Sequence, residues 1–171
     1  MYYRRQLHIS FSGLKLGNHR FEFEIDKKFF DEFGYSEYED GLLNIVVEME
    51  KQQRMLIFTF TILGTIDVVC DRCLDVFPLE IYGNYRLFVK FGNDSHEESD
   101  EVIVIPESET HFDIGHYIYE YIVLSVPMRH IHPDNEDGTS NCDPEILQKL
   151  AEHKTKEQID PRWGILKKLK E

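Results

Sequence analysis

The stretch that decides the fold is VCDRCLDVF, residues 69–77, where two long segments of alternating apolar and polar residues meet. The segment before it is apolar at Leu56, Phe58, Phe60, Ile62, Ile66 and Val68. The segment after it is apolar at Phe77, Leu79, Ile81, Tyr85, Leu87, Val89 and Phe91. Alternation of this kind predicts a β-hairpin with the stretch at its tip. Strands of about 14 residues are long, which favours strong twist or a barrel-like curl.

Shorter alternating segments predict that the chain is mainly antiparallel β-structure over about residues 1–106. They lie at residues 6–11, 20–25 and 43–49, and a short strand follows at 102–105. Gly64 falls on the apolar side of its strand and predicts a bulge or a bend. Cys70 is in phase with the same apolar side. The acidic stretches at 35–41 and 93–100 predict exposed loops.

Helix signals dominate from about residue 107 to residue 171. Asp113 is a cap for a helix that Pro127 closes, and its apolar stripe is Ile114, Tyr117, Ile118, Tyr121 and Ile122. Asp143-Pro144 and Asp160-Pro161 each predict a helix start. The inward residues of the first of these two helices are predicted to be Ile146, Leu147, Leu150 and Ala151. Asp26 predicts an earlier short helix through Phe33. We therefore expect one α+β domain over residues 1–171.

Composition bounds the kind of protein. Apolar residues make up 42% of the chain, enough for a core, and no apolar run reaches the roughly 18 residues that span a bilayer. The first residues lack the apolar core of a signal peptide, which predicts a cytoplasmic protein without a membrane partner. The net charge of −13 is unlike that of a protein that coats nucleic acid, and it suits a basic protein partner.

The odd count of three cysteines argues against a disulfide framework and favours free thiols or a metal site. Cys70 and Cys73 have the spacing of half a zinc site, and His132 and Cys142 are available to complete it. The alternative is that Cys70 is a small core residue, Cys73 a turn residue, and the histidines are solvated. Residue spacing leaves both interpretations open, so zinc is a possible cofactor.

Enzymatic activity is not expected. Redox C-x-x-C pairs usually begin a helix, whereas this pair is predicted between antiparallel strands, which disfavours a thiol oxidoreductase. Cys–His catalysis would need His130 beside Cys73 or Cys142, and nothing in the spacing selects that pairing. The sequence contains no glycine-rich phosphate loop, no G-x-S-x-G and no H-E-x-x-H motif. No small-molecule substrate is indicated.

Two features suit contact with a partner. Arg72 lies on the predicted turn, where its guanidinium could bind a phosphate or a carboxylate, or instead pair with Asp71 or Asp75. The C-terminal segment is basic, ending LKKLK at residues 166–170, and a solvated helix face is the alternative interpretation of that run. Trp163 is expected to dock the last helix onto the domain, with an exposed interface role as the alternative.

Three motifs in order resemble the YceD family, the large ribosomal RNA subunit accumulation proteins. The first is Cys70-Asp71-Arg72-Cys73 followed by Phe77, which is similar to that family's C-x-R-C-x3-F core. The second is the segment 112–127, with the family's "D-[IL] … E … L-x-[LV]-P" pattern, and the third is the segment 160–169, with its "[DN]-P-[RF]-x-x-x-L-x-x-L" tail. Many members carry a further cysteine pair before the last motif, whereas this chain has Cys142 alone, so only a mixed Cys/His site is available.

The resemblance implies a bacterial, cytoplasmic, non-enzymatic ribosome-biogenesis factor that supports accumulation or processing of large-subunit ribosomal RNA. Its partner would be that rRNA or a ribosomal or assembly protein. The motif residues that we select as contact candidates are Arg72, Phe77, Arg162, Trp163, Lys167 and Lys168. A metal-stabilised interaction module without a ribosomal role remains the alternative, and a thiol oxidoreductase ranks below it.

Overall fold

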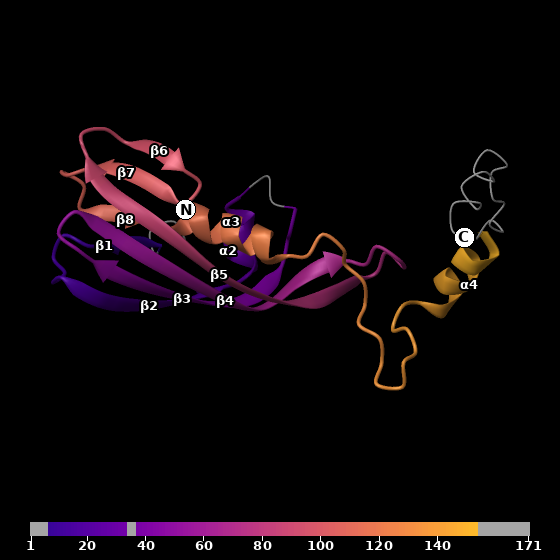
Figure 1. Ribbon diagram of the computed structural model, residues 1–171. Coiled ribbons are helices and arrows are strands. Elements are labelled where there is room, and N and C mark those ends of the chain that lie inside the picture. Colours follow the sequence, from indigo (N-terminus) through magenta and orange to yellow (C-terminus); the bar gives the residue numbers. More distant parts are fainter. Residues whose placement is uncertain (1–6, 34–36, 154–171) are drawn as a thin grey trace, which may run out of the picture. The chain divides into compact units, whose positions relative to one another are not determined.

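The structure is a computed structural model, and it describes residues 7–33 and 37–153. The chain divides into two compact units, the first of residues 1–69 and 76–130 and the second of residues 70–75 and 131–171. The strands are β1 (His8–Ser10), β2 (Gly17–Ile25), β3 (Gly41–Lys51), β4 (Met55–Val69), β5 (Val76–Gly92), β6 (His96–Ser99), β7 (Val102–Pro106) and β8 (His111–Asp113). The helices are α2 (Lys27–Asp31), α3 (Gly115–Ser125) and α4 (Pro144–His153). The α+β fold class is confirmed (Figure 1).

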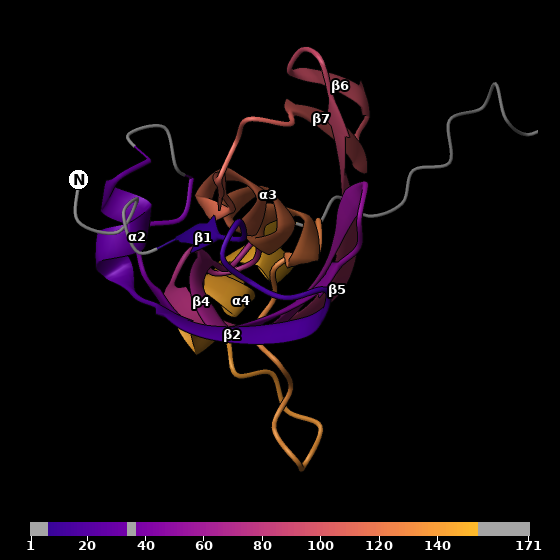
Figure 2. The ribbon, with the colours of Figure 1, turned by 90° about the vertical axis from the view of Figure 1, so that its left-hand side faces the viewer.

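Six strands of the first unit form one sheet in the order β2-β3-β4-β5-β7-β6. All neighbours are antiparallel except β5 and β7, which run parallel. β1 and β8 form a separate antiparallel pair. Figure 2 shows the sheet curled around α3 and β1. The predicted twist or barrel-like curl therefore stops short of closure into a barrel: β2 and β6 remain edges, because α3 and the β1–β8 pair already cover the apolar face that closure would have buried.

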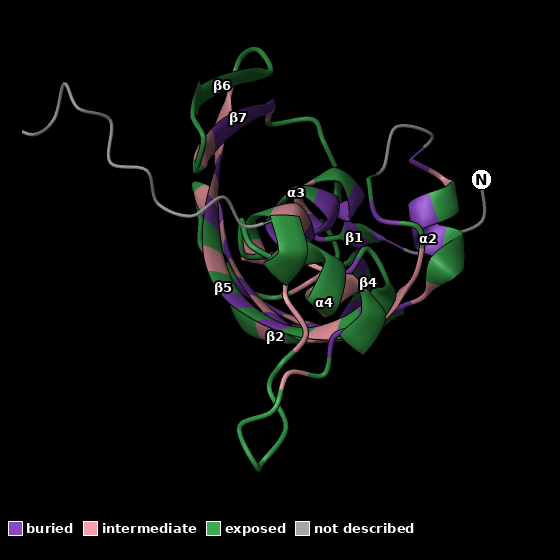
Figure 3. Ribbon diagram, turned by 90° about the vertical axis from the view of Figure 1, so that its right-hand side faces the viewer, coloured by how far each residue is buried: buried purple, intermediate pink, exposed green. Residues whose placement is uncertain are grey.

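The predicted alternation along β3, β4 and β5 is confirmed on the concave face. Eleven of its side chains are 0% exposed, namely those of Leu43, Ile45, Val47, Met49, Leu56, Phe58, Phe60, Ile62, Ile66, Leu87 and Val89. Figure 3 shows buried residues, in purple, alternating with intermediate and exposed ones along the strands of the sheet. Burying one such side chain contributes about 1.5–3 kcal/mol, so this layer is the main source of stability in the first unit.

Gly64 is a close-approach position and not a bulge. Both of its ladders stay in register, with Leu43 on one side and Ile81 on the other. Its φ of +149° is one that other residues rarely adopt, and a Cβ there would collide with the carbonyl oxygen of Leu42. Glycine is therefore required here by the backbone of the neighbouring strand.

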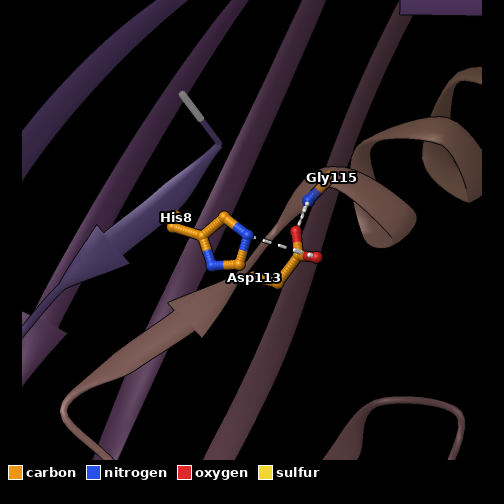
Figure 4. A network of polar contacts seen from close by, with 3 residues as sticks. All are labelled: His8, Asp113 and Gly115. Atoms are coloured by element: carbon orange, nitrogen blue, oxygen red, sulfur yellow. Dashed lines mark hydrogen bonds and ion pairs between the residues drawn. The ribbon is translucent and has the colours of Figure 1, made fainter. Parts of the chain in front are cut away.

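The sequence predicts Asp113 as the cap of α3; the N-cap residue is Ile114, one position later, and the Asp113 side chain bonds the first N–H of the helix (Figure 4). Asp113 Oδ1 accepts the backbone N–H of Gly115 at 2.8 Å, and Asp113 Oδ2 lies 3.7 Å from His8 Nε2 on β1. Asp26 likewise accepts the N–H of Lys28 at 2.9 Å and begins α2, as predicted. The predicted stripe of α3 is buried except at Tyr117, which is half-buried. That exception matters for the groove described below.

One predicted loop is a strand. Residues 96–99 of the acidic stretch form β6, which pairs antiparallel with β7 at the edge of the sheet. All four side chains of β6 are exposed, so the stretch has no apolar alternation from which the sequence could reveal a strand. The segment is a strand only because its backbone pairs with β7.

In the second unit α4 starts as predicted, because Asp143 Oδ1 accepts the N–H of Glu145 at 2.8 Å and Pro144 occupies the first turn. The predicted inward face is wrong, since no residue of α4 is buried; Leu150, for example, is 46% exposed. The helix predicted from Asp160, with Trp163, lies outside the described residues. Within the described part of the chain, no helix has the length and apolar character needed to cross a membrane.

Candidate metal centre

The turn of residues 70–75 is closed by its own backbone. Cys70 donates its N–H to the carbonyl of Asp75 at 2.8 Å, and Leu74 donates to the carbonyl of Cys70 at 2.9 Å. Leu74 adopts the left-handed conformation, with φ of 65°, which reverses the chain direction sharply. This tight turn holds both thiols of the C-x-x-C pair on one short segment, as chelation requires.

The structure brings the four predicted ligands together within the second unit. One ligand atom from each of Cys70, Cys73, His132 and Cys142 lies within 4.8 Å of all the others. The Cys70 and Cys142 Sγ atoms are 3.8 Å apart, far beyond the roughly 2.05 Å of a disulfide bond. His132 Nδ1 lies 3.4 Å from Cys73 Sγ and 3.7 Å from Cys142 Sγ. His130 is not part of the cluster.

Three of the six separations in the cluster are those of a tetrahedral zinc site, and the others lie within 4.8 Å. Zn–S bonds of about 2.3 Å at tetrahedral angles place two sulfur atoms roughly 3.8 Å apart. One Zn–S bond and one Zn–N bond of about 2.05 Å place sulfur and nitrogen roughly 3.6 Å apart. The observed 3.8 Å between sulfur atoms, and 3.4 Å and 3.7 Å from sulfur to nitrogen, match those edges. The four residues can therefore hold a metal ion with little rearrangement.

The electrostatics of the thiols also fit a cation. Burial raises the pKa of the Cys70 thiol, but the backbone N–H groups of Cys73, Arg72 and His132 outweigh burial and lower that pKa to about 6. For Cys73, burial and the adjacent thiols raise the pKa, although the N–H groups of Asp75 and Asp143 act against them. Three adjacent thiols cannot all ionise without a positive charge between them, and a bound divalent cation would supply it.

Burial sets this cluster apart within its unit. Of the described residues in the second unit, only Cys70, Cys73 and Cys142 are buried. Apolar burial contributes little to the described part of this unit, because the only buried side chains there are thiols. Small folds of this kind depend on a disulfide or a metal, and all three cysteines here are free.

The other predicted site residues are divided between surface, core and the undescribed tail. Arg72 is half-buried and donates from Nη1 to Ser140 Oγ at 3.1 Å, which joins the turn to the loop that carries His132 and Cys142. Phe77 is 6% exposed on β5, so its ring belongs to the core. The tail candidates Arg162, Trp163, Lys167 and Lys168 lie outside the described residues.

Ser140 is the site residue that the sequence did not reveal. Besides accepting from Arg72, its Oγ accepts the backbone N–H of Cys142 at 3.3 Å and so helps to orient that ligand's segment. The loop before it is closed by Asn135, which donates its N–H to the carbonyl of Thr139 at 2.8 Å. In the sequence, only the position of Ser140 two residues before Cys142 could have indicated its role. A serine that close to a cysteine is too common to identify a site residue.

Comparison with known proteins identifies the relatives of the chain. Residues 58–170 match the family described as "Large ribosomal RNA subunit accumulation protein YceD", a range that includes all four clustered residues. An uncharacterized protein of Bacillus subtilis (strain 168), YlbN, is 34% identical over 121 residues, which are 69% of this chain and 68% of YlbN. No solved structure matches the chain. The family match spans more than half of the chain, with a similar relative beside it, and the chain therefore belongs to the YceD family.

Proposed function

We propose that this protein is a non-enzymatic ribosome-biogenesis factor that supports the accumulation or processing of large-subunit ribosomal RNA. Membership of the YceD family carries the ribosomal part of this proposal, because that family is described by accumulation of large-subunit rRNA. The partner is large-subunit rRNA itself or a ribosomal or assembly protein. The net charge of −13 favours a protein contact, or an RNA contact confined to a small surface.

The proposal includes a structural zinc ion held by Cys70, Cys73, His132 and Cys142. Its carrying observation is that three of these residues are the buried residues of the described second unit, with all four ligand atoms within 4.8 Å of one another. Thiolate and imidazole ligands suit zinc better than magnesium or calcium, which prefer oxygen. The zinc would hold the turn 70–75 and the loop 131–143 as one surface.

The ligand set also supports a non-enzymatic role. Catalytic zinc sites keep one position for water or substrate, whereas four protein ligands close the coordination sphere. Thiolates bound in this way are not free to act in thiol–disulfide exchange. Arg72 remains the contact candidate of the motif, because its guanidinium has more N–H donors than the single bond to Ser140 uses.

The ribosomal part is tested by recovering the tagged full chain from cells and sequencing the RNA that comes with it. We expect large-subunit rRNA or its precursors well above the background of an untagged strain. Arg72→Ala should reduce recovery, while Arg20→Ala, at an exposed arginine of β2, should not. Recovery of rRNA at background level from the unmodified chain would exclude the ribosomal role.

A second candidate function is a zinc-stabilised interaction module without a ribosomal role, and the cluster alone favours it. Elemental analysis of the purified chain separates the two parts of the proposal. Zinc near one equivalent with no rRNA recovered supports this second candidate. Zinc near zero in protein purified without chelators would remove the metal from both.

A further inference from the structure

The first unit contains a groove that the zinc site does not involve. Its volume is about 880 Å³, within the usual range for ligand sites, and residues of β5, β6, β7 and α3 line it. Tyr85 of β5 and Tyr117 and Tyr121 of α3 form part of its wall. Figure 3 shows the β6–β7 end of the curled sheet rising beside α3, which is where these lining elements meet.

Two of the tyrosines stack face to face at the groove and form its aromatic wall, in which each ring covers one face of the other. The rings of Tyr85 and Tyr121 are stacked, with centroids 4.6 Å apart and an interplanar angle of 2°. Tyr85 Oη bonds Ser125 Oγ at 3.0 Å, and Ser125 in turn donates to the carbonyl of Tyr121 at 2.7 Å. Aromatic faces of this kind attract cations, and the planar guanidinium of arginine stacks on them.

Tyr121 contributes a second signal. The residue is 7% exposed, and its hydroxyl has no hydrogen-bond partner among the described residues. A buried hydroxyl without a partner costs free energy, so native proteins usually satisfy such groups. A ligand N–H that reached this oxygen would supply the missing bond.

The groove is negatively charged. Its lining carries four carboxylates, Glu97, Asp100, Glu101 and Glu120, against the single base Arg86. Glu120 lies 3.0 Å from His116, whereas the other three acids make no ion pair with a described residue. Burial first raises the pKa of Tyr117 and of Tyr121 to about 12, and Glu120 then adds to the rise at both rings, with Glu97 at Tyr117 and Glu101 at Tyr121.

We propose that this groove binds an arginine-bearing, extended segment of a basic partner protein. The guanidinium group lies against the Tyr85–Tyr121 wall, donates to the Tyr121 hydroxyl and pairs with Glu97 and Glu101. β6 is an edge strand, so one side of its backbone has no ladder partner in the described sheet, and an extended segment can pair there. A phosphate backbone is disfavoured because the lining would repel it. This inference specifies the partner of the proposed function as a basic protein. It rests on the proposed function only for the identification of that protein as ribosomal or an assembly factor.

The test is titration of the full chain with a labelled hexa-arginine peptide, followed by fluorescence anisotropy at low and physiological salt. We expect saturable binding that weakens with salt, and tighter binding than for hexa-lysine, because lysine lacks the planar fork. The double variant Glu97→Gln/Glu101→Gln should weaken binding about tenfold. Glu98→Gln is the matched control: it lies on the same strand but its carboxylate pairs with Lys90 at 2.6 Å, so its effect should be less than twofold.

Tyr121→Phe keeps the ring and removes only the hydroxyl, so it should weaken hexa-arginine binding several-fold without unfolding the chain. Equal effects of the Glu97/Glu101 and Glu98 variants would show binding to overall charge and overturn the proposal. Tighter binding of an oligouridylate than of hexa-arginine would overturn it in favour of RNA. Recovery of rRNA from cells tests the proposed function separately, so rRNA recovery without peptide binding leaves the function standing and removes this groove from it.

Discussion

The two units of this protein are stabilised in different ways. In the first, nine fully buried apolar side chains of β3 and β4 form one continuous layer under α3. In the second, the buried residues of the described part are three cysteines, and α4 buries none of its side chains. Apolar burial is therefore extensive in the first unit and slight in the described part of the second. There the C-x-R-C motif supplies two of the three buried residues, in the place where the first unit has an apolar layer.

The largest expected effect is loss of the metal centre, which should destabilise the second unit and leave the first unit folded. His132→Ala removes one ligand of the four, and zinc content should fall from about one equivalent per chain toward zero. Hydrogen exchange measured by mass spectrometry should then show faster exchange in residues 131–153 with unchanged protection in β3–β5.

The matched control for that change is His130→Ala, at a histidine outside the cluster. Zinc content and exchange should both remain as in the unmodified chain. Equal loss of zinc in the two variants would contradict the assignment of His132 as a ligand.

The next largest effect is destabilisation of the first unit. Phe58→Ala leaves a cavity under β4, where Phe58 is 0% exposed and stacks on Phe112 with centroids 5.4 Å apart. Denaturant unfolding followed by far-ultraviolet circular dichroism should show a loss of about 3–5 kcal/mol in the free energy of unfolding. Zinc content of the folded protein should not change. Leu63→Ala, on the same strand but 59% exposed, should cost less than about 0.5 kcal/mol.

A smaller effect concerns the backbone of the same sheet. Gly64→Ala adds a Cβ that meets the Leu42 carbonyl at a φ of +149°, so it should lower the free energy of unfolding by about 1–3 kcal/mol. Gly13→Ala is the control, because a Cβ there meets nothing within 4 Å. Equal stabilities of the two variants would show that the β3–β4 approach tolerates a side chain.

The smallest expected effect is an increase in the free energy of unfolding. Tyr121→Phe removes a buried hydroxyl without a described partner, so the free energy of unfolding at pH 8 should rise by about 1 kcal/mol. Burial and the nearby Glu120 raise the pKa of Tyr121 to about 12, from an ordinary value near 10. The folded state therefore favours the neutral ring, and stability present below pH 10 is lost as the pH rises toward 12. The variant should lose less stability between pH 10 and 12, and an equal loss would assign the effect to other groups.

Sequence patterns predicted the first unit better than the second. Strict alternation identified β4 and β5 because each buries one face, and Asp113, Asp26 and Asp143 identified helix starts because caps are local. β6 was missed because its pairing partner, and not its own side chains, makes it a strand. Whether the curled sheet would close could not be predicted, because alternation reports which face is buried but not what covers it.

The four ligands were named from the sequence, but their proximity was not derivable. Cys73 and His132 are separated by 59 residues, and nothing in residue type or spacing determines where the loop 131–143 lies relative to the turn. The groove was missed for the same reason, since Tyr85, Glu97 and Tyr121 come from three separate elements. Sites built from distant segments depend on tertiary structure that periodicity does not encode.

The spacing of the ligands along the chain also orders events during synthesis. Cys70 and Cys142 are 72 residues apart, and every described strand and helix of the first unit ends at or before Ser125. Chains fold from the N-terminus as they emerge, so the sheet can form while Cys142 is still unsynthesised. The metal centre is complete only after Cys142 has been added to the chain. Metal capture would therefore distinguish chains that extend past Cys142 from shorter nascent or truncated copies that already carry a folded sheet.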